Sequence, residues 1–141
     1  MAIKVFIDSD VFVSSLISKT GAANFLINNE SELELFVSDI SVKEISEVML
    51  RLRLKSGISD LLKRRFSKII LKDSLLEIKL RYKKYVTDID DAHIVAGAEK
   101  GNVRFLISYN IKDFKADKIK GDFGILVMSP AQFLQYLRSL K

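Results

Sequence analysis

Val5-Phe6-Ile7-Asp8-Ser9-Asp10 is the stretch of sequence that decides the fold. Its three apolar residues are β-branched or aromatic and do not alternate with polar ones, which predicts a short strand buried on both faces. Asp8 then stands at the carboxyl end of a central strand, where ligands and chemistry gather in open α/β sheets. Because a buried carboxylate is costly without a partner, we expect a cation to share this site.

The rest of the chain alternates predicted strands with predicted helices. We expect further strands at 34–37, 103–107 and 124–128, and helices at 10–17, 22–28, 41–52, 59–71, 90–100 and from Pro130 onward. Residues 75–85 are ambiguous between strand and helix and fit a short strand that leads into a helix. This order predicts an α/β fold, a three-layer α/β/α sandwich with a central, mainly parallel sheet of four to five strands, in a single domain over residues 1–141.

Composition excludes several classes of protein. The chain has 141 residues and is 48% hydrophobic, enough for a folded core. We expect no membrane span and no signal peptide, because the apolar runs are short and the chain enters a strand at once. It contains no cysteine, which excludes thiolate chemistry and fits a cytoplasmic location. With His93 as the only histidine, expected on a helix face, a metal site would use oxygen ligands, favouring Mg²⁺ or Mn²⁺.

Basic residues concentrate in the middle of the chain. Between Arg51 and Tyr85, twelve basic and three acidic residues give a net charge of +9, which leaves −4 for the remainder of a chain whose total is +5. A basic segment beside an acidic one suits a phosphate-backbone ligand together with a cation site. Solvated helix faces explain the same run equally well.

Acidic and polar side chains follow the predicted strands. In a parallel sheet the carboxyl ends of strands and the amino ends of the following helices meet at one edge. Carboxylates gathered there repel one another unless divalent cations lie between them. The side chains expected at this edge are Asp8, Glu44, Asp88, Asp90, Asp91, Ser108, Asn110 and Asp113.

Helix ends offer an ordinary explanation for most of these acids. Ser41–Glu44 matches a capping box, which would make Glu44 the third residue of its helix. Asp88 can cap the next helix, and Asp113 can cap a turn. Asp8 is the exception, because capping does not account for a charge at the end of a buried strand.

Five segments in chain order resemble the motifs of the PIN-domain family, and within it the toxin-like ribonucleases related to VapC toxins. Val5–Val11 resembles the opening motif. Val37–Glu44 resembles the segment that carries the second acid, on Glu44, and Asp88–Ala98 resembles the helix that carries the third, on Asp91. Phe105–Phe114 resembles the fourth motif, and Val127–Leu134 resembles the closing strand and helix.

This resemblance implies a metal-dependent endoribonuclease that acts on single-stranded RNA. One or two Mg²⁺ or Mn²⁺ ions would be held by Asp8, Glu44, Asp91 and Asp113, with Asn110 as the alternative to Asp113. Four side chains would orient these ligands, namely Ser9, Asp88, Ser108 and Asn110. Our own hypothesis adds four arginines as contacts to the phosphate backbone, namely Arg51, Arg53, Arg64 and Arg65.

The resemblance also implies partners, and two alternatives stay open. Toxin-like members usually form homodimers and are held inactive by a small antitoxin that docks a segment into the active-site groove. One alternative is an inactive PIN domain that only binds RNA or protein. The other is a haloacid-dehalogenase-type phosphatase, suggested by Asp8-Ser9-Asp10, although that family usually continues with Gly-Thr where this chain has Val11-Phe12.

Overall fold

A five-stranded parallel sheet forms the centre of the computed structural model, which describes residues 2–30, 32–53 and 58–140. Lys55 of the basic stretch and Gly57, expected between two helices, lie outside the described residues. The predicted α/β architecture with a parallel sheet is confirmed. In spatial order the strands are β3 (Phe66–Ile69), β2 (Leu33–Ser38), β1 (Ile3–Ile7), β4 (Phe105–Ile107) and β5 (Leu126–Met128).

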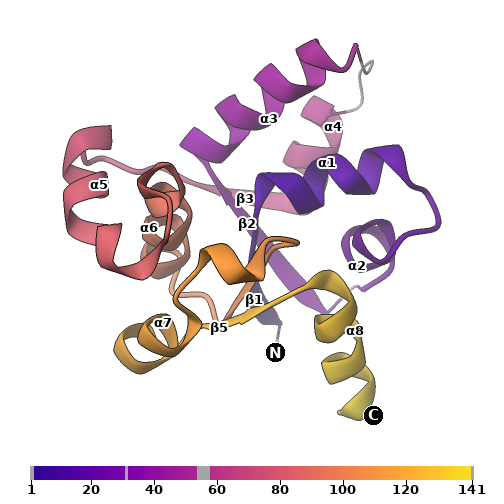
Figure 1. Cartoon of the computed structure of the whole chain (residues 1–141). Coiled ribbons are helices and arrows are strands. Elements are labelled where there is room, and N and C mark those ends of the chain that lie inside the picture. Colours follow the sequence, from indigo (N-terminus) through magenta and orange to yellow (C-terminus); the bar gives the residue numbers. More distant parts are fainter. Residues whose placement is uncertain (1, 31, 54–57, 141) are drawn as a thin grey trace.

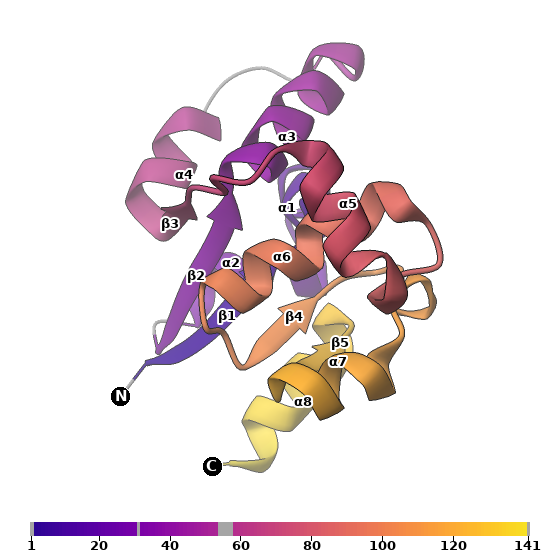
Figure 2. The same ribbon diagram turned by 90° about the vertical axis from the view of Figure 1, so that its left-hand side faces the viewer.

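Helices cover both faces of this sheet (Figures 1 and 2). One face carries α1 (Ser9–Ile17), α2 (Ala22–Asn29), α3 (Asp39–Arg51), α4 (Ile58–Arg65) and α8 (Pro130–Ser139). The other carries α5 (Leu75–Tyr82), α6 (Ala92–Lys100) and α7 (Ala116–Phe123). Short 3₁₀ turns link these elements at η1 (Lys83–Tyr85), η2 (Ile89–Asp91) and η3 (Ile111–Asp113).

Strand β1 is buried on both faces, as its apolar run predicted. Val5 and Ile7 belong to the core cluster beneath α1, α2, α3, α4 and α8, whereas Phe6 belongs to the cluster beneath α5, α6 and α7. All three side chains are fully buried. Each such burial stabilises the fold by about 1.5–3 kcal/mol, so β1 fixes the position of whatever follows it.

Strand β3 corrects one prediction. A single helix was expected over residues 59–71, but α4 ends at Arg65 and the chain continues as an edge strand paired with β2. Phe66 and Ile69 lie three positions apart, a spacing typical of one helix face. In β3 they lie on opposite faces of the sheet, Phe66 in the core cluster of Val5 and Ile7 and Ile69 against the cluster of Phe6. Phe66 packs edge-on against Phe12, with ring centroids 5.4 Å apart, and pairing with β2 supplies the backbone hydrogen bonds. Residues 75–82, left open between strand and helix, form α5.

Helix capping differs from the sequence interpretation at two sites. Asp8 is itself the N-cap of α1, since its Oδ1 accepts a 2.7 Å hydrogen bond from Ser9 N, so the view that capping does not explain Asp8 was wrong. Ser38 caps α3 by accepting from Ser41 N at 3.0 Å. Glu44 therefore lies in the second turn of α3, and the capping-box interpretation was also wrong.

The last helix begins as predicted, at Pro130 behind a Ser129 cap. In the part of the chain that the structure describes, no helix is long and apolar enough to cross a membrane.

Candidate active site

Asp8 is held at the carboxyl edge of the sheet by groups from two adjacent strands. Its backbone N–H donates to Ile107 O of β4 at 3.0 Å. Its Oδ2 accepts a 2.8 Å hydrogen bond from Ser108 Oγ, and its Oδ1 accepts from Ser9 N. The side chain is only 6% exposed. Both carboxylate oxygens therefore have fixed directions, set by the Ser108 hydroxyl and the backbone N–H of Ser9.

Asp10 belongs to the same site, although the sequence analysis did not include it among the ligands. Its Oδ2 accepts from Tyr109 N and from Asn110 Nδ2, both at 3.1 Å. Its Oδ1 is buried and has no hydrogen-bond partner among the described residues. The signal that was available is the spacing Asp8-x-Asp10, which puts both carboxylates at the first turn of one helix. Through its side-chain hydrogen bond, Asn110 contacts Asp10.

Asp91 approaches from η2, on the other side of the sheet. Asp88 caps this turn by accepting from Asp90 N at 2.9 Å. Partial burial, with repulsion from Asp88 and Asp113, raises the pKa of Asp91 to about 6. This value includes a smaller raising effect of Glu44 on the pKa of Asp91 and an opposing, lowering effect of His93. The structure thus brings Glu44 of α3 and Asp113 of η3 within electrostatic reach of Asp91 in η2.

Burial and mutual repulsion shift the acids at the end of β1 as well. Burial, with repulsion from Asp10 and more weakly from Asp91, raises the pKa of Asp8 to about 8, although the hydrogen bonds from Ser108 and Ser9 lower it. Burial also raises the pKa of Asp10, against the hydrogen bond from Tyr109 N. Such clustered, protonation-prone carboxyls are typical of functional sites, where a cation offsets the repulsion.

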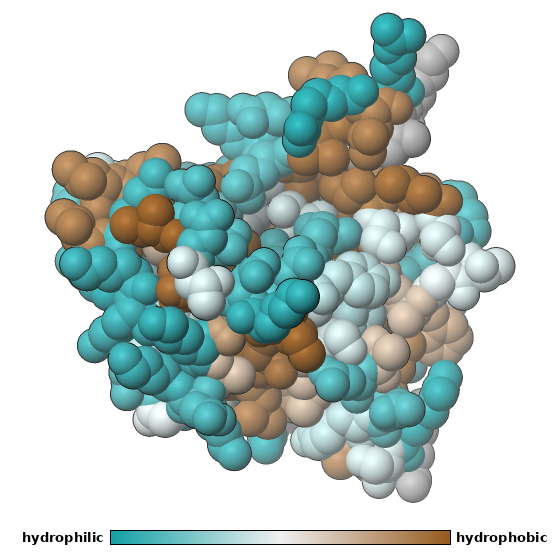
Figure 3. All heavy atoms as spheres, in the orientation of Figure 1, coloured by the Kyte–Doolittle hydropathy of each residue, from teal (hydrophilic) through white to brown (hydrophobic). Residues whose placement is uncertain are grey.

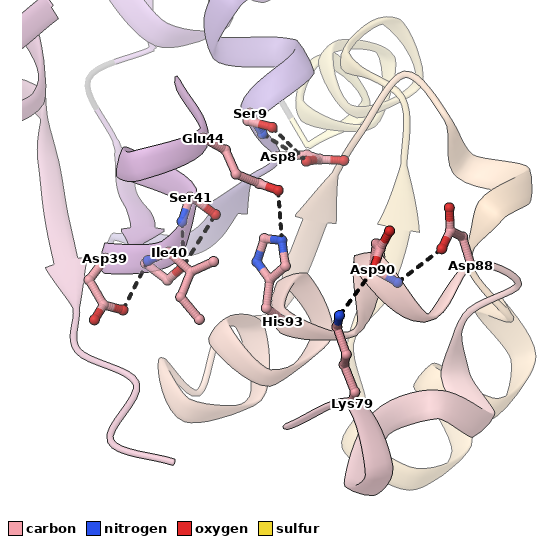
Figure 4. A network of polar contacts seen from close by, with 11 residues as sticks. Asp8, Ser9, Asp39, Ile40, Ser41, Glu44, Lys79, Asp88, Asp90 and His93 are labelled. Atoms are coloured by element: carbon pink, nitrogen blue, oxygen red, sulfur yellow. Dashed lines mark hydrogen bonds and ion pairs between the residues drawn. The ribbon is translucent and has the colours of Figure 1, made fainter. Parts of the chain in front are cut away.

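Glu44 and His93 form a pair across α3 and α6. Glu44 Oε2 lies 3.1 Å from His93 Nε2, and Figure 4 shows the Glu44 carboxylate turned toward the imidazole ring. Both residues line a pocket of about 330 Å³. The other residues in its wall are Ile40, Lys43, Glu47, Leu75, Lys79 and Asp90.

The donor chemistry of the site fits a hard divalent cation. The carboxylates of Asp8, Asp10 and Asp91 are oxygen donors, which Mg²⁺ and Mn²⁺ prefer. Among the described residues, the buried Oδ1 of Asp10 has no hydrogen-bond partner, so this oxygen is available to coordinate an ion. Within residues 2–30, 32–53 and 58–140, however, no three His, Asp or Glu side chains lie close enough together to form a complete metal site.

The four predicted phosphate-contacting arginines have different environments. Arg51, Arg53 and Arg64 are exposed. Arg65 is half-buried, and its guanidinium donates to three backbone carbonyls, Ile27 O at 2.6 Å, Glu30 O at 2.6 Å and Leu33 O at 3.2 Å. Leu33 begins β2, so Arg65 lies at the amino edge of the sheet, opposite the carboxylates. Its donors are engaged in holding the fold.

The surface around the site is mixed. Figure 3 shows hydrophilic side chains over the middle of the face seen in Figure 1, and hydrophobic side chains gathered over α5. Among the latter, Leu75, Leu76 and Leu80 are 48–66% exposed. Leu75 also lines the pocket beside Glu44, so an apolar helix face borders the charged site.

A family model described as the PIN domain matches residues 4–112, more than half of the chain. With the parallel sheet and the acids at its carboxyl edge, this match defines the class of protein. The chain belongs to the PIN domain family. A comparison with curated protein sequences finds no match.

Solved structures share the fold at low sequence identity. A toxin–antitoxin complex from Klebsiella pneumoniae aligns with a TM-score of 0.65 and 17% identity, covering 89% of this chain and 97% of the other. VapBC2 from Rickettsia felis, bound to a DNA fragment from its promoter, gives 0.60 and 14%, covering 90% and 98%. VapC20 of Mycobacterium tuberculosis, a sarcin-ricin-loop-cleaving toxin, gives 0.54 and 15%, covering 84% and 95%.

Proposed function

We propose that this chain is a metal-dependent endoribonuclease that hydrolyses phosphodiester bonds of single-stranded RNA, as the toxin of a toxin–antitoxin pair. The observation that carries the proposal is the group of carboxyls with raised pKa, Asp8, Asp10 and Asp91, at the carboxyl edge of a PIN-family sheet. The description of VapC20 as a toxin that cleaves the sarcin-ricin loop supports an RNA substrate. The family match favours this function over the haloacid-dehalogenase alternative.

The proposed ligands of Mg²⁺ or Mn²⁺ are Asp8, Asp10, Glu44, Asp91 and Asp113. When bound, the ion would supply a water of lowered pKa as the nucleophile and positive charge beside the scissile phosphate. Asn110 donates to Asp10, whereas Asp113 raises the pKa of Asp91, so we assign orientation to Asn110 and ligation to Asp113.

The exposed arginines are proposed to contact the RNA backbone. Arg51 lies on α3 seven residues beyond Glu44, which is about 10 Å along the helix axis. A strand whose scissile phosphate lies at the carboxylates would pass this arginine one or two nucleotides away. Arg53 and Arg64 are also exposed and are proposed as further contacts, whereas Arg65 is omitted because its donors bind backbone carbonyls.

A second candidate is a PIN domain that binds RNA or protein without cleaving it. It is favoured by the lack, in the described ranges, of three acidic or histidine side chains close enough to form a complete metal site. Calorimetric titration with Mn²⁺ separates the two functions, because the nuclease requires the carboxylates to bind an ion and the binding module does not.

The proposed nuclease is tested by Mn²⁺-dependent cleavage of a mixed pool of single-stranded RNAs, with single-stranded DNA as a second substrate. We expect the wild type to cleave RNA, and Asp8→Asn, Asp91→Asn and EDTA each to abolish cleavage. Asp117→Asn is the control, because Asp117 is an exposed acid in the first turn of α7. Folded wild type that neither binds Mn²⁺ nor cleaves RNA would instead support the binding module.

We also propose that the chain forms one domain, works in the cytoplasm where its RNA substrate is made, and associates as a homodimer controlled by a small antitoxin. The two toxin–antitoxin structures support an antitoxin, and the exposed leucines of α5 support an interface.

Light scattering of wild type and Leu76→Lys tests the homodimer. A monomeric wild type would refute it, and a dimeric Leu76→Lys variant would exclude α5 from the interface.

A further inference from the structure

His93 is a buried polar side chain whose position packing alone does not explain. The side chain is 3% exposed, at the second residue of α6. Its Nε2 lies 3.1 Å from Glu44 Oε2, and its Nδ1 has no hydrogen-bond partner within the described residues. An apolar side chain of similar size would fill this space without leaving a buried nitrogen unpaired, so the contact with Glu44 is the feature to be explained.

The geometry assigns the direction of this hydrogen bond. An ionised carboxylate only accepts, so the proton between the two groups belongs to His93 Nε2. In the neutral ring, Nδ1 is then a bare lone pair, and a buried acceptor is left unpaired more readily than a buried N–H donor. His93 thus directs its one N–H at one oxygen of Glu44.

Glu44 is the side chain that needs such a partner. It is 43% exposed on α3 and would otherwise sample many rotamers, whereas Asp8 is fixed by Ser108 and Ser9. The structure gives Glu44 Oε1 no hydrogen-bond partner in the described part of the chain, which leaves that oxygen free for a ligand. Holding one oxygen in the protein and presenting the other to an ion is how outer groups orient metal-binding carboxylates.

We propose that His93 is a positioning residue for the metal site: its Nε2–H fixes Glu44 Oε2 and thereby presents Glu44 Oε1 to the divalent cation. This inference rests on the proposed function, because it requires Glu44 to be a ligand. His93 itself touches neither the ion nor the RNA.

The first test uses the metal-free wild type and needs no substitution. His93 is the only histidine in the chain, so its ring signals in long-range ¹H–¹⁵N spectra need no assignment. We expect the Nε2–H form with a bare Nδ1, and a changed Nε2 chemical shift in Glu44→Ala. A ring protonated at Nδ1 alone would overturn the proposal, as would spectra that Glu44→Ala leaves unchanged.

The second test measures Mn²⁺ affinity by calorimetry in His93→Phe and His93→Gln. Phe fills the ring volume without a donor, whereas the amide nitrogen of Gln reaches about as far from Cα as Nε2 does. We expect Phe to weaken binding about 10-fold or more and Gln to restore most of the loss. Thermal unfolding of both variants shows whether they are folded.

The outcomes separate this inference from the proposed function. If the wild type binds Mn²⁺ and His93→Phe binds it equally well while folded, the positioning role is refuted and the nuclease stands. Equal weakening in Phe and Gln indicates packing and also refutes it. If the folded wild type binds no Mn²⁺, the proposed function fails and this inference fails with it.

Discussion

Ser108 Oγ donates a 2.8 Å hydrogen bond to Asp8 Oδ2 across 100 positions of sequence. The bond forms because β1 and β4 are neighbours in the sheet, so that the residue after each strand meets the other. It lowers the pKa of Asp8 against the larger effect of burial. The central carboxylate of the site is therefore fixed by the rigid edge of the sheet rather than by a mobile loop.

The raised pKa of Asp8 predicts how the stability of the metal-free protein depends on pH. Its value is about 8 in the folded state and 3.8 in an unperturbed chain, so the folded state binds the extra proton between these limits. The free energy of unfolding should therefore fall as pH rises from about 4 to about 8, with Asp91 contributing up to about 6. Asp8→Asn should flatten this decline and stabilise the protein at about pH 8.

Urea unfolding in EDTA across this pH range measures the effect. Asp60→Asn is the control, because Asp60 is an exposed acid on α4 and its removal should leave the decline unchanged. Equal slopes in wild type and Asp8→Asn would show that Asp8 does not carry the shifted proton.

Asp10 is predicted to contribute to binding the cation. Its Oδ2 already accepts from Tyr109 N and Asn110 Nδ2, which leaves Oδ1 for an ion. Asp10→Asn replaces a charged donor by a neutral one of the same shape, and we expect Mn²⁺ affinity and RNA cleavage each to fall about 10-fold or more. Asp117→Asn, an exposed acid in the first turn of α7, is the matched control. Wild-type affinity in Asp10→Asn would remove this residue from the site.

The sequence predicts the general layout of the site because a parallel sheet brings residues to one edge by topology alone. Asp8 follows an unbroken apolar run, and Asp91 begins a helix, so each is placed by local pattern. The partners of Asp10 lie 99 and 100 positions away in a loop whose conformation no short-range pattern encodes. The pairing of Glu44 with His93 likewise depends on the packing of two helices, α3 and α6, whose paired residues are 49 positions apart in the sequence.

The features that the sequence alone misassigns share one physical cause, because more than one structure is compatible with the same local sequence pattern. The three-residue spacing of Phe66 and Ile69 favours a helix, yet pairing with β2 makes the segment a strand. Arg65 looks like any other basic residue in the run until its guanidinium meets three carbonyls. Tertiary contacts decide both, and these become known only with the fold.

Substitutions of the adjacent residues Arg65 and Arg64 are predicted to have different effects on stability. Arg65→Ala leaves the carbonyls of Ile27, Glu30 and Leu33 without their donor, and we expect it to lower the free energy of unfolding by about 1–3 kcal/mol. Arg64→Ala, at an exposed position, should leave stability within about 0.5 kcal/mol. If Arg64 contacts phosphate, its removal should also reduce the salt dependence of RNA binding. Urea unfolding and binding titrations at several salt concentrations compare the pair, and equal loss of stability in both variants would contradict the structural role of Arg65.

Gly97 is predicted to set how closely α6, and with it the site, packs on β1. A Cβ at Gly97 would lie 2.6 Å from Phe6 Cε2, and Phe6 is fully buried, so α6 must move in Gly97→Ala. We expect a loss of about 1–3 kcal/mol in the free energy of unfolding. Gly121→Ala in α7 is the control, because a Cβ there meets nothing within 4 Å among the described residues and alanine favours a helix by about 1 kcal/mol. His93 precedes Gly97 by one turn of α6, so Gly97→Ala should also weaken Mn²⁺ binding. Gly121→Ala should leave Mn²⁺ binding unchanged. Unaltered Mn²⁺ affinity in a destabilised Gly97→Ala variant would mean that the site tolerates a shift of α6.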